Sequence, residues 1–231
     1  MVNADIEYQT LDFPTLKTTF GSSGNLSRQI LQGAPFCVFL SADTGYVERL
    51  QQRNRLISEP VTFATGSIAL IARPGSRIAN AIDTGDWQAL LRNHDWKERL
   101  AIANPRHAPY GVAAQQVLDA IGAPATLRPL QAENAAQALQ FVLSGGADAA
   151  LVPRALTLVE AVAGEWAVMT VDERLYKPVL HVAALVKPVA ASSTPATATD
   201  TPSSAARQLL MFLVSPQASA ILSAGGFDPA R

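Results

Sequence analysis

Short apolar runs alternate with helical stripes along this chain, and this alternation restricts its fold more than any other feature. Continuous apolar runs predict strands, whereas apolar residues at helical spacing predict helices. The expected strands are 36–40, 61–72 with a break at Gly66, 100–103, 147–152, 166–171 and 180–186. The expected helices are 26–31, 112–121, 134–143, 206–213 and 216–222. Elements of these lengths in alternation indicate an α/β fold with mainly parallel sheets.

The composition allows a sizeable core and excludes several classes of protein. The chain has 231 residues, of which 48% are hydrophobic and 16% charged, so it can form one compact unit or two small lobes. Its net charge of −1 argues against nonspecific nucleic-acid binding. One cysteine and three histidines exclude a disulfide framework and a zinc finger. The first residues lack a basic, apolar leader, so the chain is either cytoplasmic or begins downstream of one.

The segment 19–30 places a small-residue turn, Gly21-Ser22-Ser23-Gly24, directly before a helix. The free N–H groups and the positive end of the dipole at a helix start form a ready anion site, to which Ser22 and Ser23 could add hydroxyl donors. The alternative is that Ser23 or Asn25 only caps the helix. The segment is not a phosphate-binding P-loop because it lacks the lysine of that motif.

Two further helix starts have a similar character. In 104–111, Pro109 suits a first helical turn, and Tyr110 would bring a phenol to it; the alternative is a tyrosine that only packs. In 132–136, Asn134 could be no more than an N-cap.

Signs of catalysis are weak. Cys37 stands in an apolar run and is expected to be buried and unreactive. His94, His107 and His181 show no metal-ligand spacing, and Asp43 is expected to be a cap or a group that structures the lobe rather than an acid. No GxSxG or GxGxxG motif and no paired-carboxylate motif is present.

Taken together, five collinear stretches resemble the periplasmic molybdate-binding proteins that serve ABC-type molybdate importers. The stretches are 18–43, 100–118, 133–152, 175–186 and 212–227. The resemblance implies a two-lobe type II periplasmic binding protein, with lobe 1 formed by 1–65 plus 184–231 and lobe 2 by 66–183. It also implies that Ser23, Tyr110 and the backbone N–H of Ala135 bind the oxyanion, and Ser22 is added from the same loop as Ser23.

The sequence also departs from the family pattern. It would begin within the first helix, with 6–10 as the end of that helix and 14–20 as the next strand, so a strand, a ligand loop and the export signal would be missing. Cys37 replaces a common aspartate, and Pro153 stands where some members have a tyrosine ligand. The Ala-, Ser-, Thr- and Pro-rich segment 187–205 predicts a flexible loop longer than the usual connection.

The resemblance implies a binding protein, not an enzyme, that captures molybdate or tungstate between its lobes and delivers it to the permease of an ABC importer. It implies a periplasmic location, although this chain shows no signal peptide, and the protein is expected to be a monomer with no cofactor and no nucleic-acid partner. Two alternatives stay open. One is an enzyme acting on a small anion, for which Tyr110 and His107 are the only candidate catalytic residues. The other is a truncated remnant with impaired binding.

Overall fold

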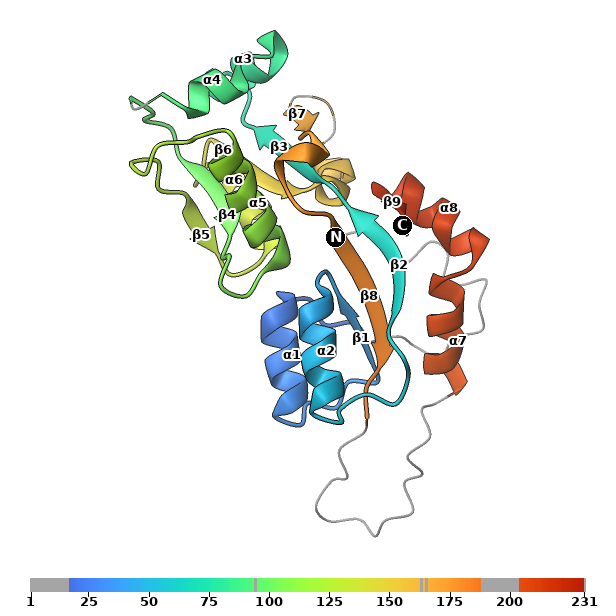
Figure 1. The fold of residues 1–231 in the computed structure, drawn as a ribbon. Helices are drawn as coiled ribbons and strands as arrows, with labels where there is room; N and C mark the ends of the chain where they lie inside the picture. The colour runs from blue at the N-terminus through green and yellow to red at the C-terminus, as the bar shows by residue number, and fades with distance from the viewer. Residues whose placement is uncertain (1–16, 94, 163, 165, 188–203, 231) are drawn as a thin grey trace. The chain divides into compact units, whose positions relative to one another are not determined.

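The computed structural model describes residues 17–93, 95–162, 164, 166–187 and 204–230 (Figure 1). The chain divides into two compact units. The first contains residues 1–65, 180–224 and 229–231, and the second contains 66–179 and 225–228. Compared with the expected lobes, the first unit resumes at Leu180 rather than at residue 184, and residues 225–228 belong to the second unit.

The first unit is built on a four-stranded sheet with the strand order β1-β8-β2-β9. Its elements, of which β2, β8 and β9 extend past its boundary, are α1 (Ser23–Leu31), β1 (Val38–Ser41), α2 (Thr44–Gln52), β2 (Val61–Gly66), β8 (Val179–Leu185), α7 (Ser204–Leu213), α8 (Pro216–Ala224) and β9 (Phe227–Pro229). β1 and β8 are antiparallel, and α1 and α2 pack beside β1 (Figure 1). A buried cluster that includes Ile30, Phe39 and Leu50 joins these helices to the sheet.

The second unit is built on a five-stranded sheet with the order β5-β4-β6-β3-β7. Its strands and α-helices are β3 (Ile68–Ala72), α3 (Arg77–Thr84), α4 (Trp87–Leu91), β4 (Leu100–Ala103), α5 (Pro109–Ala120), β5 (Leu130–Ala132), α6 (Ala135–Leu143), β6 (Ala149–Pro153) and β7 (Ala167–Thr170). Short 3₁₀ turns, η2 (Arg154–Leu158), η3 (Glu160–Val162) and η4 (Glu173–Leu175), join the later strands. α5 and α6 both pack on β4 (Figure 1).

The predicted α/β class is confirmed, but the second sheet is mixed rather than mainly parallel. β4 runs parallel to β5 and β6, whereas β3 runs antiparallel to β6 and β7. The chain passes from β2 of the first sheet to β3 of the second at Ser67, and the register pairs Ile68, the first residue of β3, with Pro153, the last residue of β6. β3 therefore enters the second sheet from the edge at which β6 ends.

Two other predictions concern segments at the limits of the described residues. The strand predicted over 14–20 is not found in its described part, where residues 17–20 are exposed and belong to no strand. The part of this prediction before residue 17, the helix end at 6–10 and most of the loop at 187–205 lie outside the described residues. Within the described ranges, every helix is too short or too polar to cross a membrane.

Candidate functional site

The carboxyl ends of three parallel strands meet at one edge of the second sheet. The register pairs Ala103 of β4 with Ala132 of β5, and Ile102 of β4 with Leu151 of β6. Asn104, just beyond β4, donates its N–H to the Ala132 carbonyl at 2.7 Å. Successive strands lie on opposite sides of β4, and ligands of α/β sheets bind where the strand order reverses in this way. We call this edge, with the starts of α5 and α6 that follow it, the carboxyl edge.

The start of α5 is packed tightly against the end of β4. Pro109 is in its first turn, and the N-cap residue, Ala108, makes no side-chain cap hydrogen bond. A Cβ atom on Gly111 would lie only 2.3 Å from the Ala103 carbonyl oxygen, so glycine is required at this contact. A helix start without a side-chain cap is suited to an anionic ligand, which can accept from its backbone N–H groups.

Tyr110 lies in the first turn of α5 and is 7% exposed. Burial is the main cause that raises the pKa of its hydroxyl far above the ordinary value, with smaller contributions from Tyr176 and Asp228. The hydroxyl therefore stays protonated throughout the neutral range. It is a neutral hydrogen-bonding group at a helix start, where the sequence predicted a phenol.

The start of α6 is capped by side chains. Asn134 accepts a hydrogen bond from the Gln137 N–H at 2.9 Å, so the capping interpretation of Asn134 is confirmed. Gln137 Oε1 in turn accepts from the Glu133 N–H at 2.6 Å. Ala135 is the first helical residue, a position whose N–H has no acceptor within the helix, and it is partly exposed. His107 Nε2 lies 3.8 Å from Glu133 Oε2 and connects the two helix starts.

The start of α1 contains the two predicted serines. Ser22 is the N-cap, and its hydroxyl accepts from the Asn25 N–H at 3.4 Å. Capping was expected of Ser23 or Asn25, but Ser23 instead accepts the N–H of Ala42, beyond β1, at 3.1 Å. A hydroxyl has one proton and two lone pairs, so this bond leaves the Ser23 proton to be donated. Both serines are buried.

The structure therefore places the predicted ligands in two groups. Ser22 and Ser23 belong to the first unit, where both lie at the start of α1. Tyr110 and Ala135 belong to the second unit, where both lie at the carboxyl edge. Each group consists of neutral hydrogen-bonding groups at a helix start, which is the chemistry that the sequence predicted for binding an anion.

Other residues considered from the sequence have structural roles or lie apart from these groups. Asp43 caps α2 by accepting from the Gly45 N–H at 2.6 Å, as predicted. Cys37 is exposed, so the prediction of a buried cysteine is wrong. It precedes an edge strand whose side chains alternate between buried and exposed, so an apolar run there does not imply burial on both faces. Pro153 is the buried last residue of β6.

His181 lies on β8 and meets the Phe63 ring edge-on, with 5.8 Å between ring centroids. Burial lowers the pKa of His181 to about 4, so its ring is neutral near pH 7. In the part of the chain that the structure describes, no three His, Cys, Asp or Glu side chains are grouped closely enough to hold a metal ion.

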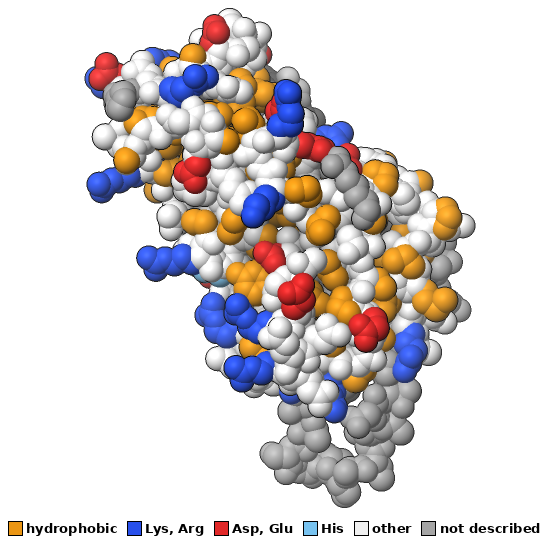
Figure 2. All heavy atoms as spheres, in the orientation of Figure 1, with side chains coloured by type: hydrophobic (Ala, Val, Ile, Leu, Met, Phe, Trp, Pro, Cys, Tyr) orange, Lys and Arg blue, Asp and Glu red, His pale blue; other side chains and the backbone are white. Residues whose placement is uncertain are grey.

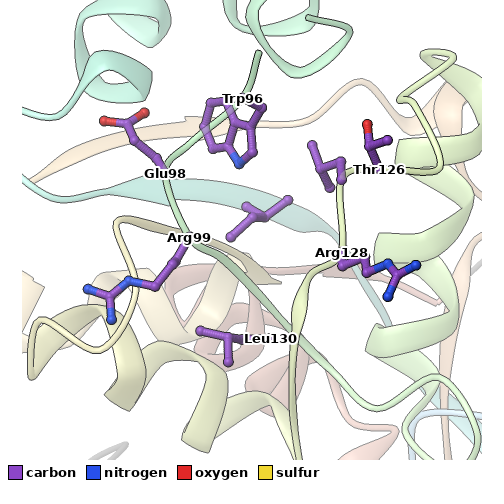
Figure 3. A pocket seen from close by; sticks show the side chains of 8 residues that line it. Trp96, Glu98, Arg99, Thr126, Arg128 and Leu130 are labelled. Carbon is purple, nitrogen blue, oxygen red and sulfur yellow. The ribbon is translucent and has the colours of Figure 1, made fainter. Parts of the chain in front are cut away.

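A cavity of about 170 Å³ lies away from the predicted ligands (Figure 3). It includes Leu100 and Leu130, the first residues of β4 and β5, so it is at the opposite ends of these strands from the carboxyl edge. Figure 3 shows the guanidinium groups of Arg99 and Arg128 pointing outward in opposite directions. The charges do not converge, and the cavity has no arrangement suited to holding an anion.

A polar group at the carboxyl edge, the hydroxyl of Ser67, was not predicted from the sequence. This residue lies between β2 and β3 and is 4% exposed. The signal in the sequence was the small polar triplet Thr65-Gly66-Ser67, which interrupts the apolar run 61–72.

Comparison with known proteins gives consistent results. The family model of the bacterial extracellular solute-binding proteins matches residues 8–228. The chain is 31% identical to the molybdate-binding protein ModA of Rhodobacter capsulatus over 216 residues, which cover 92% of this chain and 77% of that protein. It is 32% identical to ModA of Azotobacter vinelandii over 91% of this chain and 77% of that protein.

Solved structures show the same similarity. The Azotobacter vinelandii periplasmic molybdate-binding protein superposes with a TM-score of 0.78 at 28% identity, over 97% of this chain and 91% of that chain. The sulfate-binding protein SubI of Mycobacterium tuberculosis has a TM-score of 0.65 at 19% identity, over 92% of this chain and 75% of that chain, and supports the fold alone.

Proposed function

This chain belongs to the family of bacterial extracellular solute-binding proteins, and from that premise we propose that it binds molybdate, or tungstate, for delivery to an ABC importer. The proposal assigns the ion to Ser23, with Ser22 beside it, in the first unit and to Tyr110 and the Ala135 N–H in the second. The relatives named above are binding proteins, so they favour this function over an enzyme that uses the same residues.

The observation that carries the proposal is the pairing of two helix starts at the carboxyl edge. α5 and α6 begin beside the adjacent ends of β4 and β5, and the residues assigned to the ion there, Tyr110 and Ala135, contribute neutral groups. A dianion without a proton can only accept hydrogen bonds, so a set of neutral donors suits it. Such donors hold the ion by direction and spacing, which favours one ionic radius over another.

The expected strength of binding follows from the number of donors. A hydrogen bond to a charged group contributes about 1.5–3 kcal/mol before the cost of desolvating the ion is subtracted. The four assigned groups would together contribute about 6–12 kcal/mol before that cost, and a micromolar dissociation constant requires a net free energy of about 8 kcal/mol.

The test is calorimetric titration of the purified chain with molybdate, tungstate and sulfate. We expect heat of binding with molybdate and tungstate at micromolar concentration or below, and weaker binding of sulfate. An absence of heat with molybdate at millimolar concentration would contradict the proposal, and it would instead support the alternative of a remnant with impaired binding.

A matched pair of variants separates binding from stability. Ser23→Ala removes a hydroxyl that accepts the Ala42 N–H, and Ser58→Ala removes one that accepts the Leu185 N–H at 3.0 Å. Both changes leave a backbone N–H without its acceptor, so both should lower the melting temperature. Only Ser23→Ala should weaken molybdate binding, by about tenfold or more.

The family and its relatives also support the partner and the location that we propose. The protein would act outside the cytoplasmic membrane and deliver its ion to the importer's permease, working as a monomer. Reconstituted importer supplies the readout, since the chain loaded with molybdate should stimulate its ATPase more than the unloaded chain does. Equal stimulation by both forms would contradict this part of the proposal.

A further inference from the structure

The hydroxyl of Ser67 is a buried polar group that lacks a hydrogen-bond partner. The residue is 4% exposed, and among the described residues no atom lies within hydrogen-bonding reach of its Oγ in a suitable geometry. A buried hydroxyl without a partner is costly, and such groups are uncommon in native proteins. Its presence calls for a partner other than the residues that the structure describes.

The backbone on both sides of this hydroxyl is already hydrogen-bonded. The Ser67 carbonyl accepts the Arg154 N–H at 2.8 Å. The next N–H, that of Ile68, donates to Tyr176 Oη at 3.0 Å, and Tyr176 is itself 8% exposed. The peptide groups around Ser67 are therefore held in place, and neither of these two groups is available to its side chain.

Ser67 also lies at the carboxyl edge. The register pairs Ile68, the first residue of β3, with Pro153, the last residue of β6. Because β3 and β6 are antiparallel, the start of β3 is found where β6 and its parallel neighbour β4 end. α5, which contains Tyr110, contacts β3.

Tyr176, which accepts the N–H of the residue after Ser67, is connected to α5 as well. Gln116 of α5 accepts the N–H of Lys177, the residue after Tyr176, at 2.9 Å. Tyr176 is also one of the groups that raise the pKa of Tyr110, after burial. Ser67, Tyr176 and Tyr110 therefore belong to one region of the second unit, next to the ligands assigned above.

We propose that the Ser67 hydroxyl is a further donor to the bound oxyanion, an inference that rests on the proposed function. A tetrahedral oxyanion has four oxygens that each accept more than one hydrogen bond, so it can take a donor in addition to Ser23, Tyr110 and Ala135. The bound ion would supply the acceptor that the Ser67 proton lacks among the described residues.

The two substitutions Ser67→Ala and Ser76→Ala test this inference. Ser67→Ala removes an unpartnered hydroxyl, so the melting temperature of the free protein should stay the same or rise, while molybdate affinity falls about ten- to hundredfold. Ser76 is also buried, but it caps α3 beyond the other end of β3 by accepting the Ala79 N–H at 3.2 Å. Ser76→Ala should lower the melting temperature and leave the affinity unchanged.

The outcomes are distinguishable when both variants and the wild type are titrated with molybdate and unfolded by heat. A Ser67→Ala variant with wild-type affinity overturns the inference, whatever its melting temperature, and leaves the proposed function intact. A wild type that gives no heat overturns the proposed function and the inference with it. Reduced affinity in Ser67→Ala, with an unchanged or higher melting temperature and normal affinity in Ser76→Ala, supports the inference.

Discussion

The starts of α1 and α5 are both assigned to the ion, yet they are built in different ways. At α1, two side chains make hydrogen bonds to the backbone: the Ser22 hydroxyl caps the helix and the Ser23 hydroxyl accepts the Ala42 N–H. At α5, no side chain caps the helix, and its position is set by contact between the Gly111 backbone and the Ala103 carbonyl. The first start depends on hydroxyls that are partnered within the protein, and the second on close backbone packing.

This difference predicts how each start responds to change. A start held by side-chain hydrogen bonds should lose a modest amount of stability when one hydroxyl is removed, because water can partly replace it. A start held by backbone contact has no such alternative, since an added methyl group must displace the helix or the strand. The second unit should therefore be the more sensitive one to small substitutions at its site.

The largest effect is expected for Gly111→Ala. The new Cβ would lie 2.3 Å from the Ala103 carbonyl oxygen, so α5 must move away from β4. We expect a loss of about 3 kcal/mol in the free energy of unfolding, together with loss of molybdate binding. The measurement is urea unfolding followed by titration.

The matched control is Gly21→Ala, just before α1. Its Cβ would make an ordinary contact with the Leu26 side chain at 3.4 Å, so the free energy of unfolding should change by less than about 1 kcal/mol. Equal losses in the two variants would show that the starts of α1 and α5 tolerate an added methyl group equally, which would contradict this prediction.

The sequence predicted this part of the second unit well because its signals are local. The apolar run 100–103 is β4, and the stripes in 112–121 and 134–143 are in α5 and α6, with a glycine soon after each helix. α5 begins earlier than the stripe, at Pro109, because proline fits a first helical turn. The capping role of Asn134 was likewise predictable from its position.

The sequence does not show which strands pair with each other or in which direction they run. β3 is antiparallel to β6 because of where it enters the sheet, and nothing in its apolar run specifies that direction. Cys37 precedes β1, whose side chains alternate between buried and exposed, so its apolar run did not imply that every residue is buried. α2 was missed because it buries only Val47 and Leu50, which is too short a stripe to predict a helix. The unpartnered state of Ser67 depends on contacts that only the fold defines.

The second largest effect is expected for Tyr110→Phe. The change removes a buried hydroxyl without altering the ring, so molybdate affinity should fall about ten- to hundredfold, as for one hydrogen bond to a charged group. Tyr46→Phe, on α2 of the first unit, is the same chemical change at a residue that is not assigned to the ion, and it should leave affinity unchanged. The test is calorimetric titration, and equal affinities for the two variants would remove Tyr110 from the site.

The third prediction uses pH to contrast the two units. Tyr110 stays protonated in acid, whereas His181 of the first unit has a folded pKa of about 4 and an unfolded value near 6.5. As the pH falls from 6.5 to 4, the unfolded chain binds the proton first, so the folded state is progressively destabilised. At pH 5 this loss should be about 2 kcal/mol relative to pH 7.5.

The control for this prediction is His181→Gln, which cannot titrate in this range. Urea unfolding at pH 7.5 and pH 5 should show a smaller acid loss in the variant than in the wild type. The same loss in both proteins would mean that the acid sensitivity arises from other groups. The stability that is lost at pH 5 should return when the wild type is brought back to pH 7.5, because the effect is a protonation equilibrium.

The smallest effect is expected for Ser22→Ala, and it compares the cap of α1 with that of α6. The Ser22 hydroxyl accepts the Asn25 N–H at 3.4 Å, a long hydrogen bond, whereas Asn134 accepts the Gln137 N–H at 2.9 Å. Ser22→Ala should therefore cost about 0.5 kcal/mol of unfolding free energy and Asn134→Ala about 1 kcal/mol. Urea unfolding of both variants measures this order, and a larger loss in Ser22→Ala would mean that α1 depends on its cap more than α6 does. Titration of Ser22→Ala with molybdate then compares the two neighbouring serines. If Ser22 donates its proton to the ion, Ser22→Ala should lose as much affinity as Ser23→Ala.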